Sequence, residues 1–155
     1  MNIIIPIGIS GSGKSTFYND MYNGMSIICP DNIRMELTGD ISDQSKNGEV
    51  FSIVDKMVKE HIEENKSFFY DATNINTKYR VEFVNKVKKH SNVKVVYIVF
   101  PCDINVSNER IQKDITSGKN RSKVPFGVLE KQKKLYDETM KQDLFKEGAD
   151  QVIFL

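Results

Sequence analysis

Five short apolar runs alternate with longer segments of helical periodicity along the chain. The runs are rich in Ile, Val, Phe and Tyr and cover residues 2–7, 26–29, 67–71, 93–100 and 151–155. Short, continuously apolar runs are typical of strands that are covered on both faces, as in a parallel sheet. The pattern therefore predicts parallel strands, and Pro6 is expected to weaken the first strand locally without ending it.

The segments between the runs carry apolar residues at spacings of three and four, which is typical of amphipathic helices. The spacing predicts helices over residues 48–64, 78–89 and 126–145, and a further one from Asp103 to near Gly118. Strands that alternate with helices indicate a doubly wound α/β fold with right-handed crossovers.

The overall composition limits the classes of protein that fit. With 155 residues, 39% of them hydrophobic, and a formal net charge of +1, the chain is expected to form one packed domain over residues 1–155. Near-neutral charge argues against a globally basic nucleic-acid coat. The sequence predicts neither a membrane helix nor a signal peptide, and Cys29 and Cys102 form no disulfide or zinc pattern, so a cytoplasmic, reducing compartment is expected.

The string GISGSGKST, residues 8–16, is the most informative motif in the chain. It follows the first predicted strand, precedes a plausible helix and matches the G-x-x-x-x-G-K-S phosphate-binding pattern. Glycines allow a tight turn whose backbone N–H groups approach phosphate oxygens at the positive end of a helix. The residues expected to bind the nucleotide are Gly8, Ser10, Gly11, Ser12, Gly13, Lys14, Ser15 and Thr16.

Two of these side chains have a specific chemical role in such a loop. Lys14 is expected to reach the β- and γ-phosphates of ATP, and the Ser15 hydroxyl to ligate Mg²⁺. The alternative is a glycine-rich turn that binds no ligand. Position immediately after a first strand favours the nucleotide site.

Size and a missing motif narrow the class further. Motor ATPases usually need a longer chain, and a small GTPase needs an N-K-x-D string to read guanine. The segment that follows residues 93–100 reads PCDINVSNER and lacks that string. The sequence therefore favours a small kinase, in which a second substrate accepts the γ-phosphoryl group.

Asp31 is the best candidate for the group that deprotonates an acceptor hydroxyl. It follows the second predicted strand in ICPDNIRMEL, and Arg34 lies three residues later. If a helix begins here, the two side chains share one face, where the carboxylate takes a proton and the guanidinium holds a phosphate. The alternative is that Asp31 serves only as a helix N-cap.

Asp71 ends the third apolar run, in FFYDATN, where ligands of parallel α/β sheets bind. Its carboxylate is expected to hold Mg²⁺ through water or to accept a hydrogen bond from Ser15. Thr73 and Asn74 follow and are expected either to contact the acceptor or to serve as ordinary turn residues. Arg80 opens the next predicted helix and is expected either to contact phosphate or to be solvated.

Residues 110–134 are strongly basic, with eight Lys or Arg against two acidic residues. The polar middle of this segment, TSGKNRSKVP, predicts a mobile lid over about residues 110–128 that closes on the phosphates. Arg121 is the candidate for an arginine that stabilises the transition state, because a guanidinium pairs with two oxygens of the transferring group. The lysines at 131–134 are expected to form a solvated face, or to follow a polynucleotide backbone if the acceptor is one.

The ordered strings GISGSGKST, PDNIR, YDATNIN and RSKVP resemble the kinase domain of the phage polynucleotide kinases of the T-even type. These enzymes belong to a wider group of small phosphate-loop (P-loop) kinases that includes zeta-toxin-like and gluconate-kinase-like proteins. The resemblance implies a three-layer α/β/α P-loop kinase fold, a five-stranded parallel sheet of order 2-3-1-4-5 and a helical lid. It also implies ATP- and Mg²⁺-dependent phosphorylation of 5′-hydroxyl ends of DNA or RNA, with a role in nucleic-acid repair.

The resemblance also implies roles for individual residues. Asp31 becomes the general base, Arg34 the clamp on the acceptor's 3′-phosphate, and Asp71 a carboxylate of the site; Arg110 contacts the nucleotide and Val124 the acceptor. The family often carries a second arginine one turn after the position of Arg110, but Asp114 stands there in this chain. The lid charge is then expected to come from Arg121. The chain lacks a D-x-D-x-T string, so the resemblance covers only the kinase half of the phage enzyme.

Two other functions stay open at this point. One is a P-loop kinase of a small metabolite, nucleoside or nucleotide, which the near-neutral charge favours slightly. The other is an ATP-binding module without phosphoryl transfer, for which the Asp31–Arg34 pair would be superfluous. No membrane partner is expected, and self-association into a homo-oligomer is left open.

Overall fold

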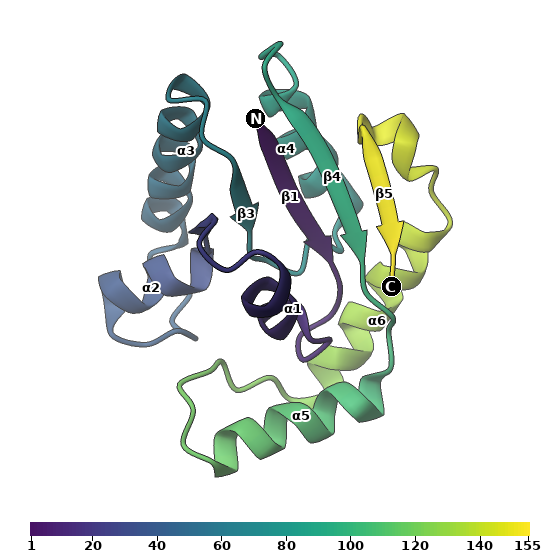
Figure 1. Cartoon of the computed structure of the whole chain (residues 1–155). Helices are drawn as coiled ribbons and strands as arrows, with labels where there is room; N and C mark the ends of the chain where they lie inside the picture. The colour runs from purple at the N-terminus through teal and green to yellow at the C-terminus, as the bar shows by residue number, and fades with distance from the viewer.

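The computed structural model describes all 155 residues, and its centre is a five-stranded parallel sheet (Figure 1). The strand order is β2-β3-β1-β4-β5, which confirms the order that the resemblance implied. All five predicted strands are present, most of them shortened by one or two residues. Their bounds are β1 Asn2–Ile7, β2 Ser26–Ile28, β3 Phe68–Tyr70, β4 Lys94–Val99 and β5 Gln151–Phe154.

The helices also follow the sequence pattern, with one correction. They are α1 Lys14–Met21, α2 Pro30–Thr38, α3 Asn47–Glu63, α4 Thr77–Val87, α5 Ile104–Thr116 and α6 Phe126–Met140. The helix predicted over 126–145 ends at Met140, and a short 3₁₀ helix, η1 Leu144–Glu147, follows. The reason is local: the Asp143 carboxylate accepts hydrogen bonds from the N–H groups of Phe145 and Lys146 and so starts a new turn. No helix has both the length and the apolar character that a membrane span requires.

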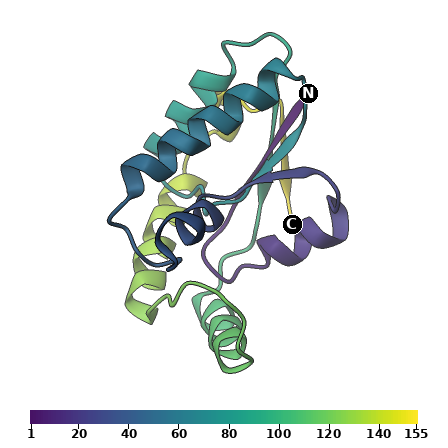
Figure 2. The same cartoon turned by 90° about the vertical axis from the view of Figure 1, so that its left-hand side faces the viewer.

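The helices cover the sheet in three layers. Figure 2 shows α3, α4 and α6 on one face and α1 on the other. Alternate residues of β1 point to the two faces: Ile3, Ile5 and Ile7 join the larger core, whereas Ile4 packs with the aromatic residues of α1. The carboxyl ends of the strands meet at one edge, where α5 and the segment that connects it to α6 also lie (Figure 1).

Pro6 lies inside the central strand β1 and does not interrupt it. A residue's N–H and C=O point to the same side of a strand. The Pro6 carbonyl accepts a hydrogen bond at 2.8 Å from the side-chain amide of Asn74, which follows β3. The missing N–H of Pro6 therefore faces the β3 side. On that side the ladder between β1 and β3 pairs only Ile3 and Ile4, so no ladder bond is lost.

Arg80 is neither a phosphate contact nor solvated, contrary to both expectations. Its guanidinium is buried and binds Glu147 of η1 through two hydrogen bonds of 2.8 and 2.7 Å. It also donates to the Asn74 carbonyl at 2.6 Å, and Tyr97 donates its hydroxyl hydrogen to Glu147 at 3.0 Å. Arg80 thus ties α4 and η1 to the loop after β3 through a fully hydrogen-bonded ion pair.

We predict that Arg80→Ala destabilises the fold by about 3–5 kcal/mol, because it leaves the Glu147 carboxylate buried without its counter-charge. Denaturant unfolding measures this change. Lys59→Ala is the matched control, since it breaks an ion pair with Glu63 whose side chains are 75% and 63% exposed. Exposed pairs of this kind contribute about 1 kcal/mol or less. Equal losses of unfolding free energy in the two variants would show that the buried pair contributes no more to stability than the exposed one.

Candidate functional site

The loop between β1 and α1 has the close-packed geometry of a phosphate cradle. A Cβ on Gly8 would lie 2.6 Å from the Ser12 hydroxyl oxygen and 2.9 Å from Cβ of Phe100, so only glycine fits there. Gly11 has φ of +73°, and a Cβ on it would meet the Ser107 carbonyl at 2.7 Å. These two positions bring the backbone of the loop tightly against its neighbours.

Hydrogen bonds from three directions fix this loop. Gly8 donates its N–H to the Thr73 carbonyl at 3.0 Å, and Arg110 donates to the Gly11 carbonyl at 3.2 Å. Gln132 of α6 accepts from the Ser10 N–H at 2.9 Å and donates to the Ser10 hydroxyl at 3.1 Å. The sequence analysis missed Gln132, because a single glutamine among helical lysines carries no signal of a contact made 122 residues away.

Lys14, the first residue of α1, buries its ammonium group under the loop. The Nζ atom donates to the carbonyls of Gly8 and Ile9 at 3.0 and 2.7 Å, and to the Ser12 hydroxyl at 3.4 Å. Burial lowers the pKa of Lys14 to about 8, although the nearby Asp71 carboxylate opposes the shift. A buried ammonium whose desolvation is compensated only in part attracts an anion such as a phosphate.

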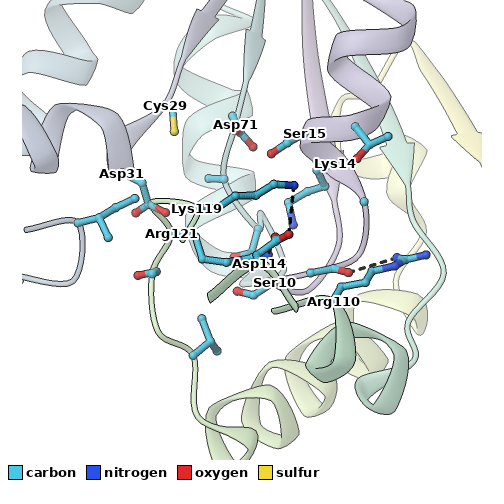
Figure 3. A pocket seen from close by; sticks show the side chains of 18 of the residues that line it. Ser10, Lys14, Ser15, Cys29, Asp31, Asp71, Arg110, Asp114, Lys119 and Arg121 are labelled. Atoms are coloured by element: carbon cyan, nitrogen blue, oxygen red, sulfur yellow. Dashed lines mark hydrogen bonds and ion pairs between the residues drawn. The ribbon is translucent and has the colours of Figure 1, made fainter. Parts of the chain in front are cut away.

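The phosphate loop opens into a cavity of about 600 Å³ at the carboxyl edge of the sheet (Figure 3). Its wall combines residues from the phosphate loop, α2, the end of β3, α5 and the segment before α6. Among the residues predicted from sequence, the cavity is lined by Ser10, Gly11, Gly13, Lys14, Ser15, Thr16, Asp31, Asp71, Thr73, Arg110, Arg121 and Val124. The structure thus gathers most of the predicted residues around one space of ligand size.

Asp31 faces this cavity from the first turn of α2, and Cys29, not Asp31, occupies the N-cap position. Arg34 lies one turn on, as the spacing predicted, and donates a hydrogen bond to Oδ1 of Asp31. The Arg34 side chain is only 6% exposed and also donates to the Asn47 side-chain oxygen, at 3.1 and 3.3 Å. Arg34 therefore does not line the cavity; it holds Asp31 in place, with Asn47 behind it.

Asp71 lies across the cavity from Asp31, beside Lys14 and Ser15 (Figure 3). Burial raises the pKa of its carboxyl group, and Lys14 opposes that shift. Cys29 packs beside it, and burial together with the Asp71 charge raises the pKa of the Cys29 thiol to about 12. The Ser15 hydroxyl and the Asp71 carboxylate are oxygen ligands of the kind Mg²⁺ accepts when phosphate oxygens and water complete its shell.

Thr73 and Asn74 have different positions. Thr73 lines the cavity, whereas Asn74 does not. With φ of +52°, Asn74 uses its side-chain amide to donate to the carbonyls of Pro6, Ala72 and Tyr70. Its amide therefore supports the turn after β3, which is the second of the two roles that the sequence left open for it.

The segment between α5 and α6 places two cations in the cavity. Arg121 and Lys119 both pair with the Asp114 carboxylate of α5. The Lys119 ammonium nitrogen lies 3.3 Å from Oδ1 of Asp114. The side chains of Arg121 and Asp114 are 25% and 28% exposed, and the charge of Arg121 also acts on Lys14. Asp114, which stands where the resemblance implied a second arginine, thus binds and orients the Arg121 side chain.

Comparison with protein families gives one match. A family model described as an AAA domain, AAA_33, matches residues 3–139. Comparison of the sequence with curated proteins found no match.

Solved structures with the same fold extend this result. A chain in the structure of the Pnkp1/Rnl/Hen1 RNA repair complex aligns over 92% of this chain with 18% identity and a TM-score of 0.78. This chain covers only 46% of that one. A gluconokinase from Sinorhizobium meliloti 1021 (17% identity, TM-score 0.56, 99% of this chain and 81% of that chain) and shikimate kinase from Acinetobacter baumannii (19%, 0.53, 98% and 82%) also match. The fold is that of the P-loop kinases.

We predict that near and above a pH of about 8, the pKa of Lys14, binding of ATP takes up a proton and weakens as the pH rises further. Below that pH the Lys14 ammonium is already protonated. Above it, Lys14 is mostly neutral and must be protonated again before it can bind phosphate, because the bound anion raises the Lys14 pKa towards its ordinary value. Calorimetric titrations in buffers of different ionisation enthalpy measure how many protons are taken up when ATP binds. Lys14→Met should abolish both the uptake and the pH dependence, and an uptake that persists in this variant would contradict the assignment.

Proposed function

We propose that this chain, which belongs to the AAA domain family AAA_33, is an ATP-dependent kinase that phosphorylates the 5′-hydroxyl ends of DNA or RNA. The observation that carries the proposal is the placement of Asp31 and the phosphate loop around one cavity. A carboxylate held by a buried guanidinium, opposite a triphosphate cradle, is what in-line transfer to a hydroxyl requires.

The proposed reaction uses the residues of this cavity directly. The acceptor hydroxyl attacks the γ-phosphorus, its proton passes to the Asp31 carboxylate, and the bond between the γ-phosphorus and the β–γ bridging oxygen breaks to release ADP. Arg34 binds one oxygen of Asp31, and the other has no protein donor. That free oxygen is the proposed proton acceptor, and Arg34 positions it. A direct clamp on the acceptor's 3′-phosphate, the role that the resemblance implied for Arg34, would require its guanidinium to leave Asp31 and Asn47.

The phosphates are held by the loop and the lid. Lys14 and the loop N–H groups bind the β- and γ-phosphates, and Arg110 lies beside the loop. Arg121, oriented by Asp114, stabilises the charge that develops on the transferring group, and residues of about 110–128 act as the lid. When bound, Mg²⁺ would neutralise phosphate charge, held by Ser15 and, through water, by Asp71.

Three observations support a polynucleotide as the acceptor. The motifs resemble those of polynucleotide kinases across the chain, and residues 110–134 are strongly basic. The fold is also similar to a chain of an RNA repair complex. Val124 and Thr73 line the cavity and are the proposed acceptor contacts. A basic segment beside the site follows a phosphodiester backbone better than it serves an uncharged small acceptor.

A small-molecule acceptor is the second candidate. The net charge of +1 and the similarity of the fold to a gluconokinase and a shikimate kinase favour it. Assays of gluconate, shikimate and nucleosides beside 5′-hydroxyl oligonucleotides separate the two candidates.

We predict that Asp31→Asn lowers kcat for phosphate transfer to a 5′-hydroxyl oligonucleotide by about 10²- to 10⁴-fold, because general-base catalysis is lost. Transfer of label from γ-³²P ATP measures the rate, and ATP binding should be unchanged. Asp20→Asn, on the exposed part of α1, is the matched control. Full activity of Asp31→Asn would exclude Asp31 as the base; ATP binding by a wild-type chain that transfers phosphate to no acceptor would indicate a binding module.

We also predict that Arg121→Ala lowers kcat by about 10³-fold or more, as expected for an arginine that contacts the transferring phosphoryl group. Lys123→Ala removes a charge from the same segment at an exposed position and should change kcat little. Equal effects of the two substitutions would mean that the lid acts only through its overall charge.

A further inference from the structure

A second cavity, of about 660 Å³, lies between α3 and α4. Both helices cover the same face of the sheet (Figure 2). We name it the α3–α4 pocket; it is lined by, among others, Phe51, Tyr70, Tyr79 and Phe83. Ala72 and Thr73 line both this pocket and the phosphate-loop cavity. The two spaces are therefore neighbours, separated by the loop that follows β3.

Aromatic side chains on both helices give the pocket its character. Tyr70 and Phe83 stack in parallel, with ring centroids 4.5 Å apart and an angle of 5° between the planes. Phe51 on α3 and Tyr79 on α4 are 46% and 67% exposed, although aromatic side chains usually bury most of their surface. Exposed rings on both walls of a pocket suit a flat aromatic ligand that stacks on them.

The charges of the pocket disfavour a phosphate as its occupant. The Arg80 guanidinium is buried and bound to Glu147, and the Lys86 ammonium pairs with Asp55 at 2.7 Å across the two helices. Glu82 adds a carboxylate to the lining. Both cations of the lining are paired with carboxylates of the protein, and Glu82 adds a further negative charge, so the pocket favours an uncharged part of a ligand over a phosphodiester.

We propose that the α3–α4 pocket binds a nucleobase of the acceptor strand, on the 3′ side of the nucleoside whose 5′-hydroxyl faces Asp31. This inference rests on the proposed function. The terminal nucleoside must bring its hydroxyl to Asp31 in the first cavity, and the chain beyond it passes the loop at Thr73 to reach the aromatic walls. Stacking is tolerant of base identity, so the pocket selects strands over single nucleotides without reading sequence.

The test compares acceptors of different length on wild type, Tyr79→Ala and Phe51→Ala. Tyr79 and Phe51 are 67% and 46% exposed and neither belongs to a buried core cluster, so their truncation spares the core. We expect each substitution to reduce the KM advantage of a 5′-hydroxyl oligonucleotide over a nucleoside 3′-monophosphate by roughly 5- to 100-fold, as loss of one stacked base would. Phe145→Ala is the matched control, because Phe145 is 59% exposed and lies outside both cavities.

A binding measurement makes the inference independent of catalysis. An oligonucleotide with 2-aminopurine next to the terminal nucleotide, or one position further, should lose fluorescence on binding wild type but not Tyr79→Ala. An abasic site at whichever of these two positions shows the quenching should remove the KM advantage for wild type.

The outcomes distinguish this inference from the proposed function. If Tyr79→Ala and Phe51→Ala phosphorylate oligonucleotides with the same KM advantage as Phe145→Ala, the inference is overturned and the proposed function stands. Equal losses for the mononucleotide and the oligonucleotide would assign the pocket to the terminal nucleoside and also overturn it. Fluorescence quenching without phosphate transfer would support the pocket and reject the kinase.

Discussion

The burial of the Lys14 ammonium group is the constraint on which the rest of the site depends. Two loop carbonyls and the nearby Asp71 charge compensate its desolvation only in part, which is why its pKa is lowered. A multivalent anion supplies the missing compensation better than water does, because it brings charge and acceptors together. The close packing of the loop over Lys14 also requires glycine at positions 8 and 11, because a side chain at either position would collide with neighbouring atoms.

The acceptor side of the cavity is fixed by a different principle. A carboxylate on the exposed first turn of a helix can adopt several rotamers, so its oxygens would have no fixed position. The buried Arg34 guanidinium removes that freedom at Asp31, and Asn47 fixes Arg34 from the start of α3. The orientation of the proposed base is thus set by the packing of α2 against α3, and a substitution at Asn47 would act on Asp31 through Arg34.

Local patterns in the sequence were sufficient for the strands, most helix bounds, the phosphate loop and the shared face of Asp31 and Arg34. Each of these depends on spacings of a few residues, which backbone geometry fixes. The sequence did not reveal the bond between Ser10 and Gln132 or the pair between Arg80 and Glu147, whose partners are 122 and 67 residues apart. Such contacts depend on how helices dock on the sheet, and no local pattern encodes that docking.

The loop after β3 decides how the two cavities can be used together. Gly8 binds the Thr73 carbonyl at 3.0 Å, Arg80 binds the Asn74 carbonyl at 2.6 Å, and the Asn74 amide binds three further carbonyls. These bonds hold in place the loop that separates the two cavities. In the proposed function, an acceptor long enough to reach both cavities would bind the second as an intramolecular step, whereas a short acceptor would gain nothing from it. In the proposed function, the buried ion pair at Arg80 would therefore affect the choice of acceptor through this loop, because Arg80 also binds the Asn74 carbonyl.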